Sequence, residues 1–158
     1  MSLLEIFHAL EYSSLLIAMR SSPWLFPVIA TIHLFGLAMI GGAVLVFNLR
    51  LLGVGLVNQS PRELARQTIP LLLAGVTVML VTGPFLFMCF ATKYYYLSPF
   101  WIKLVAFTFV LSLTFAVRRV LEDADGERFV LVWRIPLAAT SLLLWFSVAL
   151  GGRLIGFP

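Results

Sequence analysis

The chain has 158 residues, of which 61% are hydrophobic and only 11% are charged. Because about a quarter of the residues of a soluble domain are charged, this chain cannot cover itself with a polar surface, and its composition predicts an integral membrane protein. The net charge of +4 does not indicate a nucleic-acid partner, since the arginines lie in short segments beside apolar runs, where they set membrane topology.

The N-terminal segment, residues 2–20, shows a helical periodicity with one apolar and one polar face. Two carboxylates, His8 and several serines make it too polar to cross a bilayer. An amphipathic helix that lies in the membrane interface fits this pattern better. The segment also lacks a basic region and a small-residue cleavage site, so we expect no removable signal peptide.

Four apolar segments follow, and each is long enough to cross a membrane at about 20 residues per crossing. They cover residues 23–50, 69–91, 99–117 and 135–154. The sequence therefore predicts an all-α membrane fold. In this fold, a bundle of four transmembrane helices and the N-terminal amphipathic interfacial helix form a single domain over residues 1–158.

Glycines and helix breakers give these segments local detail. In the first span, Gly36, Gly41 and Gly42 offer a smooth surface for the close approach of another helix. Pro84 removes a backbone hydrogen bond inside the second span and predicts a kink there. Ahead of that span, Ser60 is expected to cap a separate short helix.

Two connections between the spans have a distinctive composition. The stretch VLEDADGER carries most of the acidic residues, and we interpret it as a solvated loop because it lacks the ligand spacing of a calcium site. Between the second and third spans, aromatic residues predict a belt at the membrane–water interface, in contact with lipid or a partner protein. They are Tyr94, Tyr95, Tyr96 and Trp101.

The distribution of lysine and arginine predicts the orientation. Seven such residues lie at the first-to-second and third-to-fourth connections: Arg50, Arg62, Arg66, Arg118, Arg119, Arg128 and Arg134. Four lie on the other side: Arg20, Lys93, Lys103 and Arg153. The side with seven is expected to be cytoplasmic, which places both termini on the periplasmic side of a bacterial inner membrane.

Several stretches resemble a family of small bacterial inner-membrane proteins of unknown function. They are LEYSS, RSSPWLFPVIATIHLFG, NLRLLG, YLSPFWIK and SLLLWFSVALGGRLIGF. The resemblance implies four transmembrane helices. It extends more loosely to membrane cytochromes of b type and to copper-resistance membrane proteins. The chain departs from the family pattern at Ala30, Asn48 and Val117, where relatives often carry an acid, an aspartate and a histidine.

His33 lies within the first span, and an imidazole in a transmembrane helix is a candidate functional residue. As a ligand of haem b it would need a second axial ligand at similar depth. Met79 or Met88 could supply a thioether, and His8 could serve only from a re-entrant position. Alternatively, the imidazole could hydrogen-bond a neighbouring helix or take part in proton or ion passage.

Two arginines near the ends of spans are further candidates. Arg153 could snorkel to the interface, pair with Glu5 or Glu11, or bind a haem propionate or a lipid phosphate. Arg50 closes the first span and either sets topology or contacts lipid headgroups. Cys89 has no ligand partner at metal spacing, and we interpret it as a packing residue.

The sequence shows no catalytic constellation and no metal-ligand spacing, so we do not expect an enzyme. The first hypothesis is a non-catalytic accessory or scaffold subunit of a larger membrane complex of energy conversion. It would contact lipid and other subunits or a second copy, and would carry no cofactor. The second is a small electron-transfer subunit that uses His33 with haem b or a bound quinone. The third is a permease for small solutes or metals.

Overall fold

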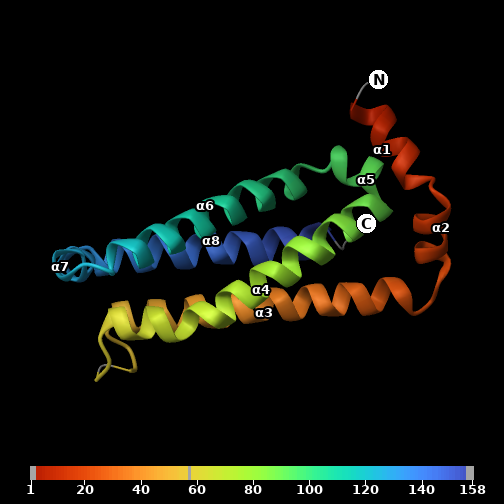
Figure 1. Cartoon of the computed structure of the whole chain (residues 1–158). Coiled ribbons are helices and arrows are strands. Elements are labelled where there is room, and N and C mark those ends of the chain that lie inside the picture. Colours follow the sequence, from red (N-terminus) through yellow and green to blue (C-terminus); the bar gives the residue numbers. More distant parts are fainter. Residues whose placement is uncertain (1–2, 57, 156–158) are drawn as a thin grey trace.

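The computed structural model describes residues 3–56 and 58–155, and over these residues the chain forms helices and no strands. Among the described residues, four helices are long and apolar enough to cross a membrane. They are α3 (Leu25–Leu52), α4 (Pro61–Cys89), α6 (Ser98–Val120) and α8 (Arg134–Ile155). The predicted all-α bundle of four transmembrane helices is therefore confirmed (Figure 1).

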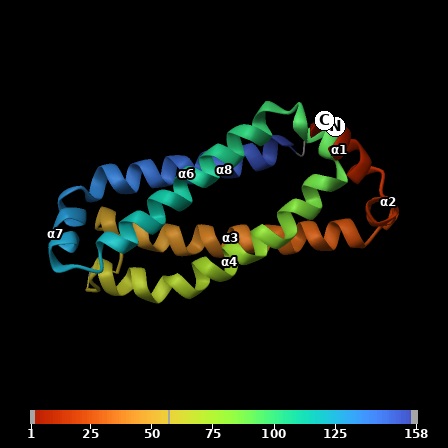
Figure 2. The same ribbon diagram turned by 45° about the horizontal axis from the view of Figure 1, so that its top comes forward.

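Short helices lie at both ends of this bundle (Figures 1 and 2). One end carries α1 (Leu3–Glu11), α2 (Ser14–Ser21) and α5 (Ala91–Tyr95), together with the last turn of α8. We name it the terminal end. The other end carries α7 (Ala124–Val132) and the connection from α3 to α4. We name it the loop end.

The N-terminal segment forms two helices, so the prediction of one continuous helix over residues 2–20 is wrong. α1 ends at Glu11 and α2 begins at Ser14, with Ser13 in an extended conformation between them (φ −66°, ψ 145°). The change of direction lets Leu16 and Met19 of α2 pack against Cys89 of α4 in a small buried cluster. Tertiary packing thus outweighs the helical periodicity of the sequence.

α4 begins eight residues earlier than the predicted second span, at Pro61 instead of residue 69. The Ser60 cap is confirmed, because its hydroxyl accepts a hydrogen bond from the Glu63 N–H at 3.1 Å. The helix that it caps is not separate, however. It continues through Pro70 and Pro84 into the span, so the polar first turns of α4 are an extension of the transmembrane helix.

The connection between the third and fourth spans contains α7, so the prediction of a loop is wrong over these residues. Asp123 occupies the N-cap position in an extended conformation. Val130 of α7 is buried in a cluster with Leu121 and Ala138, and this apolar contact folds the segment against the bundle. The first, third and fourth spans begin and end within one to three residues of their predicted limits, a normal uncertainty for helix ends.

α3 and α4 approach closely at two glycines. A Cβ on Gly75 would lie 2.7 Å from the Gly36 carbonyl oxygen, and one on Gly36 would lie 2.8 Å from Cγ1 of Val78. The predicted role of Gly36 in helix packing is therefore confirmed. A Cβ on Gly41 or Gly42 would meet no atom within 4 Å, so these two glycines do not pack against a helix in the described part of the chain.

The four long helices form two pairs, α3 with α4 and α6 with α8, and α3 also packs against α8. A core of fully buried side chains holds the pairs together near the middle of the bundle: Ile40, Leu72, Val110 and Val148. α4 diverges from α3 toward the terminal end (Figures 1 and 2). α4 and α6 share few contacts, and this separation creates the site described next.

Candidate functional site

A cavity of about 1000 Å³ lies between α4 and α6 and extends from the middle of the bundle toward the terminal end. Its walls are mainly apolar and aromatic side chains of these two helices. His33 of α3 and Gly152 of α8 also line it, as do Phe7 of α1 and Tyr94 of α5. The volume is at the upper end of the range typical of small-molecule sites in proteins.

His33 lines this cavity and is held in one orientation by Thr82 of α4. Its Nδ1 lies 2.7 Å from the Thr82 hydroxyl oxygen. With that hydroxyl donating its own proton to the Val78 carbonyl at 2.6 Å, we assign Nδ1–H as the donor to Thr82 and Nε2 as the nitrogen that carries the lone pair. The predicted hydrogen bond to a neighbouring helix is therefore present. No described residue is bonded to Nε2.

Lys103 of α6 is the second polar residue of interest in the cavity, and sequence reasoning used it only to count charges. Two glycines of α8 make room for it. A Cβ on Gly151 would lie 3.1 Å from the Lys103 Cβ, and one on Gly152 would lie 3.6 Å from the Lys103 Nζ. Within residues 3–56 and 58–155, the ammonium forms no ion pair and no hydrogen bond. A lysine this close to a helix end is easily interpreted as snorkelling to the interface.

The structure separates the predicted haem ligands. Met79 of α4 lines the cavity with His33, whereas Met88 packs beside the cluster formed by Leu16, Met19 and Cys89. His8 stacks on Tyr12 at 5.5 Å, outside the transmembrane helices. The interpretation of Cys89 as a packing residue is consistent with its complete burial.

The remaining pair, His33 and Met79, does not fit the axial positions of a haem. His33 is bonded to Thr82, which lies three residues from Met79 on α4, so both side chains belong to one wall of the cavity. Axial ligands must approach the iron from opposite faces of the porphyrin. The α6 wall offers Thr108 and Ser112 but no histidine or methionine.

The aromatic residues predicted as an interfacial belt are divided between the cavity and the surface. Tyr94 and Trp101 line the cavity. Trp101 also donates from Nε1 to the Tyr95 carbonyl at 2.9 Å, which ties α6 to α5. Tyr96 is 68% exposed. Burial raises the pKa of the Tyr94 phenol, so this hydroxyl stays protonated next to the cavity.

The two arginines near helix ends have different surroundings. Arg153 is exposed near the end of α8. Arg50 donates from Nε to the Gln59 carbonyl at 2.5 Å and thereby folds the connection from α3 to α4 back onto α3. Arg50 thus forms a structural contact that was not part of either role predicted for it, which were setting the membrane topology and contacting lipid headgroups.

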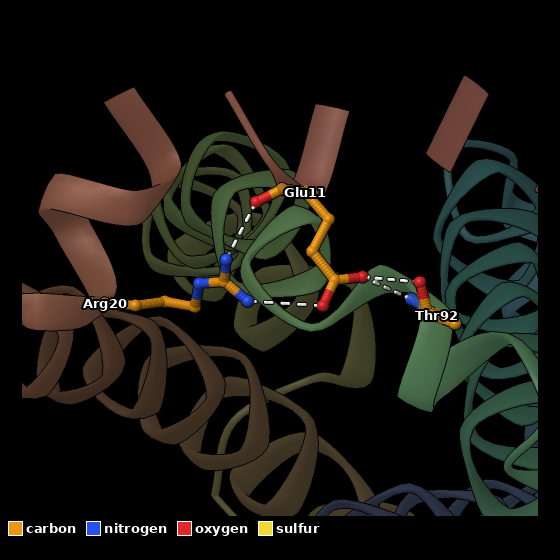
Figure 3. Close-up of polar contacts among 3 residues, drawn as sticks. All are labelled: Glu11, Arg20 and Thr92. Atoms are coloured by element: carbon orange, nitrogen blue, oxygen red, sulfur yellow. Dashed lines mark hydrogen bonds and ion pairs between the residues drawn. The ribbon is translucent and has the colours of Figure 1, made fainter. Parts of the chain in front are cut away.

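The carboxylate of Glu11, the last residue of α1, joins this helix to Arg20 of α2 and Thr92 of α5 (Figure 3). Its Oε1 accepts from Nη1 of Arg20 at 3.2 Å, and its Oε2 accepts from the Thr92 hydroxyl and N–H at 2.6 and 2.9 Å. Burial opposes the ionised form, but these hydrogen bonds and the guanidinium outweigh it and lower the pKa of Glu11. Phe7 of the same helix packs edge-on against Phe87 at 5.3 Å.

Comparison with known proteins supports one assignment. Residues 25–158, from the start of α3 onward, match the sequence profile of DUF6644. The chain belongs to DUF6644, a family of unknown function. No curated protein and no solved structure matches it. The predicted resemblance to a family of unknown function is thus confirmed, and the looser similarity to cytochromes and copper-resistance proteins receives no support.

This DUF6644 member also buries polar groups that sequence reasoning missed. Arg118 of α6 is only 6% exposed. Its Nη1 donates to the Ala65 carbonyl and its Nη2 to the Thr68 hydroxyl at 2.8 Å, while its Nε is buried without a partner. The guanidinium also lies 5.5 Å from the centre of the Phe47 ring. This arginine fastens α6 to α4 at the loop end.

A buried amide completes the polar structure of the DUF6644 bundle. Asn48 of α3 donates from Nδ2 to the Ser141 hydroxyl of α8 at 2.9 Å, and both residues are buried. No group of three or more potential metal ligands comes together among the described residues.

Proposed function

We propose that this multi-pass membrane protein binds a lipid-soluble small molecule in the cavity between α4 and α6. The observation that carries the proposal is the pairing of an apolar cavity with two polar groups, His33 Nε2 and the Lys103 ammonium, that have no partner in the described chain. A polar group that leaves water without a new hydrogen bond costs about 1–3 kcal/mol. A ligand with a polar head would remove this cost.

The composition of the cavity wall supports an apolar occupant. The aromatic residues that line it are Phe7, Phe87, Tyr94, Phe100, Trp101, Phe107 and Phe115. Small-molecule sites combine such walls with a few polar groups that orient the ligand. Water could satisfy the two polar groups, but it would leave most of this aromatic surface without a favourable contact.

The occupant would enter from the bilayer. Leu80, Leu104 and Phe115 line the cavity and are each at least 40% exposed, so the cavity opens on the lipid-facing side of the bundle between α4 and α6. At the terminal end, by contrast, Phe7 of α1 covers it. A molecule dissolved in the membrane would therefore reach the site without passing through water.

Filling the cavity tests the proposal. Thr108 of α6 and Thr77 of α4 are both exposed and both donate to the carbonyl four residues earlier, but only Thr108 lines the cavity. We expect a lipid-soluble compound to be enriched in solvent extracts of purified wild-type protein and Thr77→Trp, and lost from Thr108→Trp, as measured by mass spectrometry. Identical extracts from all three proteins would refute the proposal.

Haem is not part of the proposal, because His33 and Met79 share a wall of the cavity and α6 contributes no second ligand. A reduced-minus-oxidised absorption spectrum of the same preparations checks this choice. We expect no haem band. A haem band that disappears in His33→Ala would show that the cavity binds haem and not the proposed organic ligand.

An accessory role in a larger membrane complex is a second proposal. Its support is the open surface at Gly41 and Gly42 of α3, where a helix of another subunit or of a second copy could approach closely. Gentle purification from native membranes tests it. We expect a larger complex for the wild type, its loss in Gly42→Leu, and its retention in Ala139→Leu, a control at an exposed position of α8. A wild-type protein that migrates as a monomer would rule this role out.

A permease function has less support. His33 and Lys103 lie toward the terminal end and Arg118 toward the loop end, and the fully buried apolar residues Ile40 and Val110 belong to the core between them. These apolar residues separate the charged residues of the two ends among the described residues. We do not propose transport.

We retain the orientation inferred from the arginine count as a proposal, with the loop end in the cytoplasm of a bacterium and the terminal end in the periplasm. The positive-inside rule is its support. A reporter enzyme active only in the periplasm, fused after residue 158, should be active, whereas the same reporter inserted after Gly55 in the connection from α3 to α4 should be inactive. The reverse pattern would invert the orientation.

A further inference from the structure

The polar groups of the cavity specify the head group of its ligand. We infer that the cavity binds the hydroxyl form of an aromatic lipid, a quinol, one O–H of which donates to His33 Nε2 while its other oxygen accepts from Lys103. This inference rests on the proposed function and adds the chemical class of the ligand. It depends on the tautomer of His33, on the position of Lys103 and on the aromatic wall.

The tautomer of His33 selects a hydrogen-bond donor. Thr82 is buried, and with its hydroxyl proton assigned to the Val78 carbonyl its oxygen accepts from Nδ1–H of His33. A neutral imidazole protonated at Nδ1 offers a lone pair at Nε2. A ligand carbonyl at this position would place its oxygen, which can only accept a hydrogen bond, against the lone pair of Nε2, which also only accepts. A ligand hydroxyl would form a hydrogen bond.

Lys103 supplies the complementary group. An ammonium has three donors and no acceptor, so it favours an oxygen with a free lone pair. His33 belongs to α3 and Lys103 to α6, and both line the same cavity. A ring that carries oxygens on opposite sides can contact polar groups on two different helices, whereas a single terminal hydroxyl reaches them less readily.

The aromatic wall favours a ring beside these groups. Phe100 of α6 stacks on Phe87 of α4 with ring centres 5.1 Å apart, and Tyr94 stacks on Phe100 at 5.7 Å. These rings lie on the terminal side of the cavity, the half that contains Lys103. Ring–ring contacts of this kind add to the hydrophobic contribution of burial. The apolar residues toward the middle, including Leu111 and Phe115, are placed to receive a hydrocarbon tail.

The test compares the reduced and oxidised forms of one probe, decylubiquinol and decylubiquinone, under anaerobic conditions. Binding to the purified protein in nanodiscs is followed by tryptophan fluorescence, and the same titration of Trp101→Phe identifies the part of the signal that comes from Trp101 in the cavity wall. Only the reduced probe carries the O–H groups. Since one hydrogen bond separates the two forms at Nε2, we expect the quinol to bind about tenfold more tightly to the wild type.

Variants separate the two polar contacts. In His33→Phe the preference for the quinol should disappear. In Thr82→Val the imidazole loses its fixed tautomer, so the preference should shrink while thermal stability confirms that the protein is folded. Lys103→Met should weaken the binding of both the quinol and the quinone, and Lys103→Arg should restore part of the lost affinity. The control Lys93→Met, at an exposed lysine of α5 outside the cavity, should bind as the wild type does.

The outcomes distinguish this inference from the proposed function. If both probes bind equally to the wild type and Thr108→Trp abolishes both, the cavity binds lipid-soluble molecules but the inferred head group is wrong. If neither probe binds to the wild type, the inference is also wrong, and the solvent extracts of wild type and Thr108→Trp decide independently whether the cavity has another occupant. A quinol preference that survives in His33→Phe would likewise overturn the inference.

Discussion

At the loop end of the bundle a buried polar contact ties α4 to α6, whereas toward the terminal end a cavity lies between the two helices and the stacking of Phe100 on Phe87 joins them. The tie is the guanidinium of Arg118, which donates to the Ala65 carbonyl and the Thr68 hydroxyl. Near it, the amide of Asn48 is bonded to Ser141. These contacts are buried and lie within the chain, so the polar groups of the loop end hold the fold together.

The cavity has the opposite character. His33 uses one ring nitrogen to contact Thr82 and leaves the other open, and Lys103 has no partner among the described residues. Both side chains are only partly buried, and the cavity that they line opens toward the bilayer. In this protein, a polar residue is therefore a functional candidate when a ligand can reach it, and polarity alone does not distinguish it from a structural residue. Even the unpartnered Nε of Arg118 is sealed from any ligand.

The largest effect is expected from removing the tie at the loop end. Arg118→Met removes the charged donor to the Ala65 carbonyl and the Thr68 hydroxyl and takes the guanidinium away from the Phe47 ring. The loss of these charge-assisted hydrogen bonds and of packing should lower the free energy of unfolding by about 3 kcal/mol. Equilibrium unfolding in mixed micelles measures this loss.

Arg119→Met is the matched control, because Arg119 is the exposed neighbour of Arg118 on the same helix. It should change the unfolding free energy by no more than about 0.5 kcal/mol. Equal losses of unfolding free energy in the two variants would show that the stability depends on charge near the membrane surface and not on the buried contacts of Arg118. The proposed difference between the two ends of the bundle would then be wrong.

The second-largest loss of stability is expected at the close contact between α3 and α4. Gly75→Ala would place a Cβ 2.6 Å from Cγ1 of Ile40 and 2.7 Å from the Gly36 carbonyl oxygen. Overlap with backbone must move the helices apart, at a cost of about 2 kcal/mol. Gly42→Ala, where a Cβ meets nothing within 4 Å, should be neutral or slightly stabilising. If Gly42→Ala destabilised the protein as much as Gly75→Ala, the close approach of α3 and α4 at Gly75 would not be the cause of the loss.

The fold was largely predictable because apolar runs of membrane-spanning length have few alternative structures. The errors fall where tertiary contacts decide. Tyr12 and Ser13 contain no helix breaker, yet the chain turns there to pack α2 against α4. α7 forms because Val130 reaches a buried cluster at the bundle surface. Neither contact can be inferred from the local sequence.

The candidate site was only partly predictable. His33 stands out as an imidazole inside a span, but its partner Thr82 lies 49 residues away. Lys103 and Arg118 entered the sequence argument only as charges near membrane surfaces. Whether such a side chain points to lipid, to a cavity or to another helix depends on the rotation of its helix. In helices that are apolar on nearly every side, the sequence pattern does not determine that rotation.

A smaller effect should follow from Ser141→Ala, which leaves the buried amide of Asn48 without its acceptor. We expect a loss of about 1 kcal/mol in the free energy of unfolding. Ser147→Ala on the same helix is the control, since the half-buried Ser147 hydroxyl is bonded to the Leu143 carbonyl of its own helix. Similar losses in both variants would mean that the Asn48–Ser141 bond does not hold α3 to α8.

The smallest effect is local and concerns the fastening of α1 over the cavity. The pKa of Glu11 is lowered from its ordinary value of 4.5, so its ionised form stabilises the closed position. That contribution is complete above pH 4.5 and is lost as the pH falls through the lower pKa of the folded protein. Arg20 and Thr92 provide the contacts that depend on it (Figure 3).

Amide hydrogen exchange of residues 5–11 in wild type and Glu11→Gln measures this dependence. At neutral pH the variant should exchange several-fold faster, because an uncharged amide binds Arg20 less strongly than a carboxylate does. Below pH 4.5 the difference should narrow as the wild-type carboxylate takes up its proton. Comparing both proteins at each pH cancels the intrinsic pH dependence of exchange. If the difference persisted in acid, the charge of Glu11 would not be what keeps α1 over the cavity, and closure of the terminal end would depend on the contact between Phe7 and Phe87.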